Sequence, residues 1–115
     1  MTTSINDFFT AWTNADGDAR VALISGAMAE GAFYADPRTD APMTDATAIA
    51  DYVGMFASMG MPVTVVNLST TLTHVRATVQ FGEGDQGQMG QYCVDLDAAG
   101  KITRMVGFAG MGEPS

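Results

Sequence analysis

The order of patterns along this chain predicts an α+β fold, in which three helices pack on one face of a curved, mostly antiparallel sheet. Apolar residues recur with helical period over much of the first half of the chain. The second half is rich in Val, Thr and Leu, and polar residues alternate there with apolar ones, which is typical of half-buried strands. Helices that precede a four-stranded antiparallel meander in this way are typical of the α+β class.

Two helices are expected at the start of the chain. Ser4 and Asp7 have the spacing of a capping box, with Asp in place of the usual Glu, so they open the first helix. Residues 14–17 (Asn-Ala-Asp-Gly) then end it. Asp18 is expected to cap a second, shorter helix. Residues 27–30 are expected to form a turn that leads into the first strand.

A short strand over residues 32–35 and a third helix follow. Pro37 has no backbone donor and a fixed φ, so the strand is expected to stop at Asp36. Thr44 or Asp45 can cap the helix. Its apolar residues recur at the i, i+3, i+4 and i+7 positions of one helical face, and they are Ile49, Tyr52, Val53 and Phe56. Asp36 therefore lies between aromatic residues and an amphipathic helix, which is a suitable place for a working carboxylate.

Four antiparallel strands are predicted over residues 63–69, 72–81, 89–96 and 102–109. Residues 82–87 spell the dinucleotide-binding pattern G-x-G-x-x-G, but they join two strands and open no helix, so a hairpin turn is expected. Alternation places one set of side chains on the inner face of the sheet: Ala77, Val79, Phe81, Tyr92, Val94, Met105, Gly107 and Ala109. The alternate set then faces outward, including Arg76, Arg104, Val106 and Phe108.

Length and composition indicate a single domain over residues 1–115 with one core. No apolar run reaches the roughly 18 residues of a membrane span, and the N-terminus lacks the pattern of a secretory signal. A single cysteine cannot form an internal disulfide, which favours a cytoplasmic location. The net charge of −8 disfavours nucleic acid and anionic membranes as partners. The tail 113–115 is expected to be disordered.

Metal and cofactor sites have little support in the sequence. Structural zinc usually takes four His or Cys ligands, and the chain has one of each, His74 and Cys93. Cys93 is expected to be a small buried residue in mid-strand, and His74 to be exposed or at an edge. The segment 95–100 imitates the start of a calcium loop but lacks the later ligands. We therefore expect no metal and no cofactor.

Four segments carry a family resemblance through their order and spacing: Phe8–Asp18, Phe33–Pro37, Ala48–Val53 and Asp97–Arg104. They resemble the SnoaL-like branch of the nuclear transport factor 2-like superfamily, and the likeness extends over nearly the whole chain. The resemblance implies a cone-shaped, cystatin-like fold, in which three N-terminal helices and a short strand face a bent antiparallel sheet around an apolar pocket. It also implies a homodimer through the outer face of the sheet.

Within that superfamily, ketosteroid isomerase offers the most direct catalytic comparison. Its Asp-Pro base motif matches Asp36 and Pro37. The position of its tyrosine donor falls on Phe9, which has no hydroxyl, and the position of its protonated aspartate falls near Tyr92. Because removing one oxyanion donor typically costs about 10²–10³ in kcat, steroid isomerisation of the usual kind is not expected.

The resemblance and the residues together give a site hypothesis. Asp36 is a general base, partly desolvated by Phe33 or Tyr34 and by Tyr52 and Phe56. Tyr92 donates a hydrogen bond to an oxygen of the substrate. The expected lining of the pocket is Phe9, Trp12, Tyr34, Tyr52, Phe56, Val79, Phe81, Val94 and Met105. The expected function is that of a cofactor-independent isomerase, cyclase or dehydratase acting on a small, apolar molecule that contains oxygen.

Two alternatives stay open at this point. Asp36 could serve structure alone, by capping the turn after Pro37 or by pairing with Arg38. The same pocket could then bind a small ligand without chemistry. Because function does not follow from a fold alone, the chain could also be a dimeric interaction module. The apolar residues expected inside the cone argue against this alternative.

Overall fold

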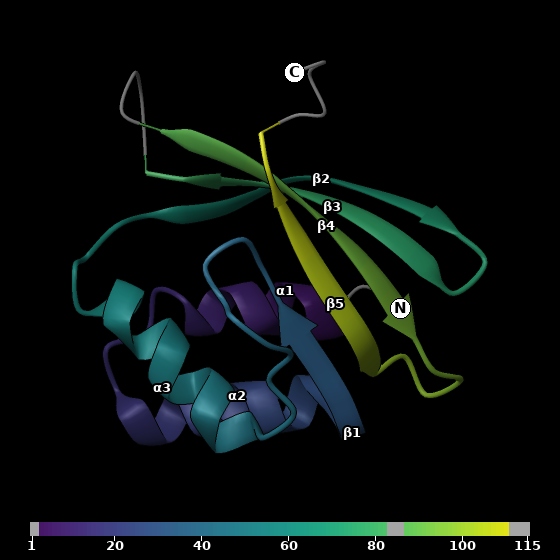
Figure 1. The fold of residues 1–115 in the computed structure, drawn as a ribbon, viewed down its shortest axis with the longest axis horizontal. Helices are drawn as coiled ribbons and strands as arrows, with labels where there is room; N and C mark the ends of the chain where they lie inside the picture. The colour runs from purple at the N-terminus through teal and green to yellow at the C-terminus, as the bar shows by residue number, and fades with distance from the viewer. Residues whose placement is uncertain (1–2, 83–86, 111–115) are drawn as a thin grey trace.

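The computed structural model describes residues 3–82 and 87–110, and in these residues three helices lie against one face of a curved five-stranded sheet (Figure 1). The elements in chain order are α1 (Thr3–Ala11), α2 (Gly17–Ala27), β1 (Met28–Ala35), α3 (Ala46–Ala57), β2 (Val63–Thr71), β3 (His74–Phe81), β4 (Gln88–Leu96) and β5 (Ile102–Ala109). The predicted α+β class is confirmed, and so is the predicted order of two helices, a strand, a third helix and a four-stranded meander.

The sheet has the order β1-β5-β4-β3-β2. Strands β2 to β5 form the predicted antiparallel meander, whereas β1 pairs with β5 in parallel. In this register Tyr34 of β1 lies opposite Met105 of β5, and Gly107 of β5 lies opposite Tyr92 of β4. The parallel pairing thus brings Tyr34 and Tyr92 to one region of the inner face, although 58 positions separate them.

Two local predictions need correction. Asp16, and not Asp18, is the N-cap of α2, and its carboxylate accepts a hydrogen bond from the backbone amide of Asp18. Strand β1 begins at Met28, so the predicted turn over residues 27–30 is wrong. Pairing of Met28 with Ile102 of β5 makes this segment a strand, with a break in register before Phe33 and a positive φ at Gly31.

The predicted alternation of the sheet is confirmed for most positions. Inner-face residues such as Val79, Val94 and Met105 are buried, while Arg76 and Arg104 of the outer face are exposed. Among the inner-face residues, Phe81 is half-buried and Ala109 is exposed. Alternation also corrects the expectation for Cys93, which is exposed because it lies between the buried residues Tyr92 and Val94.

The third helix begins as predicted. Asp45 is its N-cap and accepts a hydrogen bond from the backbone amide of Thr47 at 3.2 Å.

Residues 83–86 of the predicted turn, and the tail 113–115, lie outside the described residues. Among the helices of residues 3–82 and 87–110, none combines the length and apolar character needed to cross a membrane.

Candidate functional site

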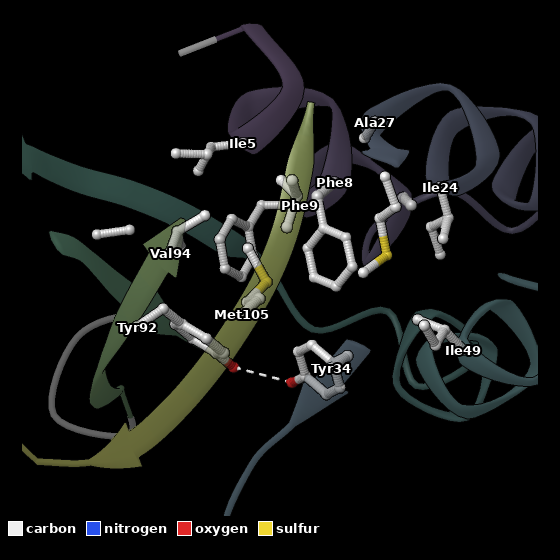
Figure 2. Close-up of a cluster of buried hydrophobic side chains, with 14 of the residues drawn as sticks. Ile5, Phe8, Phe9, Ile24, Ala27, Tyr34, Ile49, Tyr92, Val94 and Met105 are labelled. Atoms are coloured by element: carbon white, nitrogen blue, oxygen red, sulfur yellow. Dashed lines mark hydrogen bonds between the residues drawn. The ribbon is translucent and has the colours of Figure 1, made fainter. Parts of the chain in front are cut away.

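Much of the space between the helices and the sheet is filled by side chains. Phe8 and Phe9 project from α1 toward Tyr34, Tyr92 and Met105 (Figure 2). Several residues predicted to line a pocket belong to this buried cluster and pack against one another there, namely Phe9, Trp12, Tyr34, Val79, Val94 and Met105.

A hollow of about 170 Å³ lies at the edge of this core. Its walls come from the end of β3, from β4, from the end of β5 and from the loop after β1. The lining residues are Asp36, Pro37, Arg38, Phe81, Gln88, Met89, Gly90, Tyr92, Phe108 and Ala109. The structure therefore brings Asp36, Tyr92 and Phe81 of the predicted site to one hollow. Phe108, predicted for the outer face, also lines this hollow, near the end of β5.

A second hollow of about 220 Å³ adjoins the first. The two share Arg38, Phe81 and Gln88, and the second is also lined by Phe56, Met59 and Met61. The Arg38 guanidinium carbon lies 5.4 Å from the centroid of the Phe56 ring, a cation–π distance. Of the aromatic residues predicted to line the pocket, Phe56 thus faces the second hollow, and its ring positions Arg38 between the two.

The loop after β1 fixes Asp36 in place. One carboxylate oxygen, Oδ1, accepts a hydrogen bond of 2.8 Å from the backbone amide of Arg38. The backbone carbonyl of Asp36 accepts from the amide and from the hydroxyl of Thr39. Tyr34 and Met43 exchange backbone hydrogen bonds that close the loop. Asp36 therefore stabilises the turn through the Arg38 amide, as one of the alternative hypotheses expects, and it also faces the hollow.

The other carboxylate oxygen of Asp36, Oδ2, accepts hydrogen bonds from two phenols. The Tyr34 hydroxyl of β1 lies 2.6 Å from it, and the Tyr52 hydroxyl of α3 lies 2.7 Å from it. Hydrogen bonds to an ionised acceptor are short. The two tyrosines consequently fix the direction in which the Asp36 carboxylate points.

A third phenol extends this network. The Tyr92 hydroxyl of β4 lies 3.3 Å from the Tyr34 hydroxyl (Figure 2). Burial raises the pKa of Tyr92 to about 12, and it raises the pKa values of Tyr34 and Tyr52 further, with additional contributions from their hydrogen bonds to Asp36. All three phenols therefore keep their protons at neutral pH, so each has one hydrogen to donate.

Sequence reasoning did not find this network of Asp36 and three tyrosines. It left open whether Phe33 or Tyr34 desolvates Asp36, and the structure shows that Tyr34 is fully buried while Phe33 lies beside Arg104. The alternation of β1 carries that information, because Ala32 and Tyr34 share the buried face. No local pattern indicates that the hydroxyl of Tyr52 reaches across from α3.

No protein-family model and no curated protein sequence matches this chain. Among solved structures, a proposed isomerase of the SnoaL-like family from Agrobacterium tumefaciens is 23% identical, with a TM-score of 0.81 over 95% of this chain and 96% of that one. A protein from Catenulispora acidiphila with the ketosteroid isomerase-like fold, solved in complex with trimethylamine, is 17% identical, with a TM-score of 0.70 over 90% of this chain and 82% of that one.

A third similar structure is SalBIII, an epoxide hydrolase/cyclase-like enzyme of pyran ring formation in the polyether salinomycin. It is 18% identical, with a TM-score of 0.69 over 94% of this chain and 88% of that one. Identities at this level establish architecture and leave the reaction open. The chain has the nuclear transport factor 2-like fold.

Proposed function

We propose that this protein is a cofactor-independent enzyme that transfers a proton on a compact, mostly apolar substrate containing oxygen. In this proposal Asp36 is the general base and Tyr92 forms a hydrogen bond to an oxygen of the substrate. The observation that carries it is the position of Asp36, a half-buried carboxylate that lines a hollow and is oriented by two phenols on one oxygen. Orientation of a base by neighbouring groups favours proton transfer because the reactive geometry is set beforehand.

The size and lining of the hollow support a substrate of this kind. A closed cavity of about 150 Å³ is large enough to admit benzene, so about 170 Å³ suits one ring with a few substituents. Phe81, Met89 and Phe108 give it apolar walls. Arg38 and Gln88 add two polar side chains that can orient an oxygen of the substrate.

The similar structures support the reaction class. The Agrobacterium protein is a proposed isomerase, and SalBIII is described as epoxide hydrolase/cyclase-like. Isomerisation, ring closure and dehydration all need a base that removes a proton and an acid that returns one. The network around Asp36 offers both, since a carboxylate and protonated phenols lie within hydrogen-bond distance of each other.

The proposal is tested by turnover. The purified chain is incubated with β,γ-unsaturated ketones, hydroxy-epoxides and β-hydroxy ketones that contain a single ring. The products are separated by chromatography and identified by mass spectrometry. Asp36→Asn is expected to lower the rate about 10²- to 10⁴-fold on any compound that the wild type converts. Asp40→Asn is the matched control, because Asp40 is an exposed carboxylate of the same loop. Conversion by Asp36→Asn at the wild-type rate would exclude Asp36 as the base.

A specific observation favours a second candidate, the binding of a small alkylammonium ion without chemistry. The hollow combines the Asp36 carboxylate with the rings of Phe81, Tyr92 and Phe108, and aromatic faces attract cations. The Catenulispora protein was solved with trimethylamine. Titration of this chain with trimethylammonium, followed by NMR, separates the candidates: saturable shifts at the hollow that vanish in Asp36→Asn, with no conversion of any test compound, would favour binding.

A further inference from the structure

We propose that Tyr92 and Tyr34 form an indirect proton path from the hollow to Asp36, beside the direct contact that Asp36 itself makes with the hollow, and that the site therefore selects a ligand with a hydroxyl group. This inference deepens the proposed function and rests on it for the identity of the base. A tyrosine hydroxyl has a single hydrogen to donate. A carboxylate only accepts hydrogen bonds, so the contact of 2.6 Å between Tyr34 and Asp36 uses the single hydroxyl hydrogen of Tyr34.

The use of that hydrogen fixes the direction of the next hydrogen bond. Tyr34 has no second hydrogen to give, so the contact of 3.3 Å between the two hydroxyls is made by the hydrogen of Tyr92. The alternative, in which Tyr34 turns its hydrogen to Tyr92, would exchange a short charge-assisted bond for a longer neutral one. While Asp36 is ionised, the chain of donors therefore runs from Tyr92 to Tyr34 to Asp36.

This direction decides what the hollow presents to a ligand. Tyr34 is fully buried and does not line the hollow, whereas Tyr92 does. The hydrogen of Tyr92 points away from the ligand toward Tyr34, so the free part of its oxygen is a lone pair. Tyr92 thus acts as an acceptor toward the hollow in the resting protein, and a ligand O–H is its natural partner. An alcohol, an enol or a phenol has this group, and a simple ketone or ether lacks it.

The same path can carry a proton when a hydroxyl substrate reacts. The ligand O–H bond breaks as a new O–H bond forms on Tyr92, Tyr92 passes its original proton to Tyr34, and Tyr34 passes its own to Oδ2 of Asp36. Three O–H bonds break and three form, so one proton moves from the ligand to Asp36 and both phenols stay neutral. Neutral phenols throughout agree with the raised pKa values of Tyr34 and Tyr92.

The transfer reverses the direction of the chain. Protonated Asp36 now donates to Tyr34, Tyr34 donates to Tyr92, and Tyr92 donates to the oxygen of the ligand. Tyr92 therefore takes the donor role expected from the sequence only after Asp36 has accepted a proton. The negative charge that develops on the ligand oxygen is then stabilised by a hydrogen bond that Tyr92 does not donate in the resting protein. An interaction made only as the charge develops lowers the activation barrier and does not merely tighten binding of the ground state.

Two probes of equal ring size test the direction of the chain at equilibrium, without any need for turnover. Cyclohexanol can donate a hydrogen bond and cyclohexanone can only accept one. Their dissociation constants are measured by NMR titration in the wild type and in Tyr34→Phe, Tyr92→Phe and Tyr52→Phe. In Tyr34→Phe the Tyr92 hydrogen loses its acceptor and is free to turn into the hollow, so cyclohexanone is expected to bind about three- to tenfold more tightly, the value of one neutral hydrogen bond.

The other variants separate this path from a general packing role. Tyr92→Phe is expected to weaken cyclohexanol about three- to tenfold and to leave cyclohexanone unchanged. Tyr52→Phe removes a donor from the same Asp36 oxygen without contacting Tyr92, so the ratio of the two dissociation constants should stay at the wild-type value. If Tyr34→Phe does not fold, the Tyr92→Phe ratio carries the test.

Three results would overturn the inference: weaker or unchanged binding of cyclohexanone to folded Tyr34→Phe, equal weakening of both probes in Tyr92→Phe, or no binding of cyclohexanol to the wild type. Because these are equilibrium measurements, they are independent of whether Asp36→Asn loses turnover. A failed base assignment and a failed proton path therefore give different results.

Discussion

Gly107→Ala should displace Tyr92 and destabilise the fold. Gly107 lies opposite Tyr92 in the sheet, and the Tyr92 ring covers it on the inner face. A methyl group at this position would lie 2.6 Å from Cε2, 3.0 Å from Cδ2 and 3.1 Å from Cζ of that ring. Carbon atoms in contact prefer about 3.5–4.0 Å, so the ring would have to retreat by roughly 1 Å. Overpacking of this kind costs about 1–3 kcal/mol.

The hydrogen bond from Tyr92 to Tyr34 would be lost with the same movement, because its length of 3.3 Å already lies near the limit for such contacts. A broken neutral hydrogen bond adds about 1 kcal/mol. We therefore expect a loss of about 2–4 kcal/mol in the free energy of unfolding. Urea denaturation measures it through the fluorescence of Trp12, the single tryptophan, which is buried against Phe56 and Phe81.

Gly26→Ala is the matched control for this experiment. Gly26 is an exposed residue of α2, and no atom lies within 4 Å of the position of its added methyl. Alanine should therefore stabilise the chain by about 0.5–1 kcal/mol through helix propensity. If Gly107→Ala unfolds at the same urea concentration as the wild type, the close contact between β5 and the Tyr92 ring has no energetic weight. The absence of a side chain at Gly107 would then not be what allows the Tyr92 hydroxyl to reach Tyr34.

Two further predictions concern stability. The pKa of Tyr92 is raised from 10.0 to about 12, and the pKa values of Tyr34 and Tyr52 are raised as well, so the folded state retains protons that the unfolded state releases. The stability that these groups contribute is fully present below pH 10 and is lost as the pH rises toward 12. Urea denaturation at a series of pH values should show this loss as a falling midpoint concentration of urea. A constant midpoint over that range would contradict the prediction. Gly31→Ala should cost about 1–2 kcal/mol, because Gly31 has φ of 78° with no atom within 4 Å of its added methyl, and an unchanged melting temperature would exclude backbone strain there.

The sequence predicted the elements whose signals are local. Pro37 ends β1 near Asp36, and Asp45 caps α3, because a missing donor and a capping carboxylate act within a few residues. Alternation in β3, β4 and β5 indicated which residues face inward, since it follows from strand geometry alone. The start of β1 at Met28 was missed because parallel pairing with β5 depends on a strand more than 60 positions away.

Prediction of the candidate site was limited in the same way. Asp36 and Tyr92 were expected to share a site, and both line the same hollow. Whether the inward-facing aromatic residues line a cavity or fill it depends on the distance between the helices and the sheet. The periodicity of apolar residues in the sequence gives no information about that distance. Phe9, Trp12 and Tyr34 pack into the core, and the hydrogen bonds of Tyr34 and Tyr52 to Asp36 depend on the register of β1 and the position of α3.

The parallel pairing of β1 with β5 also determines when the fold can be completed during synthesis. Within the described residues, β5 is the only strand beside β1 and is also the last to leave the ribosome. Until then both edges of β1 are open, and Tyr34 and Met28 lack the strand that will pair with them. Unpaired edges and exposed apolar residues in partly made chains favour association with other chains. Slower translation after β4 should therefore lower the yield of folded protein more than slower translation before β1.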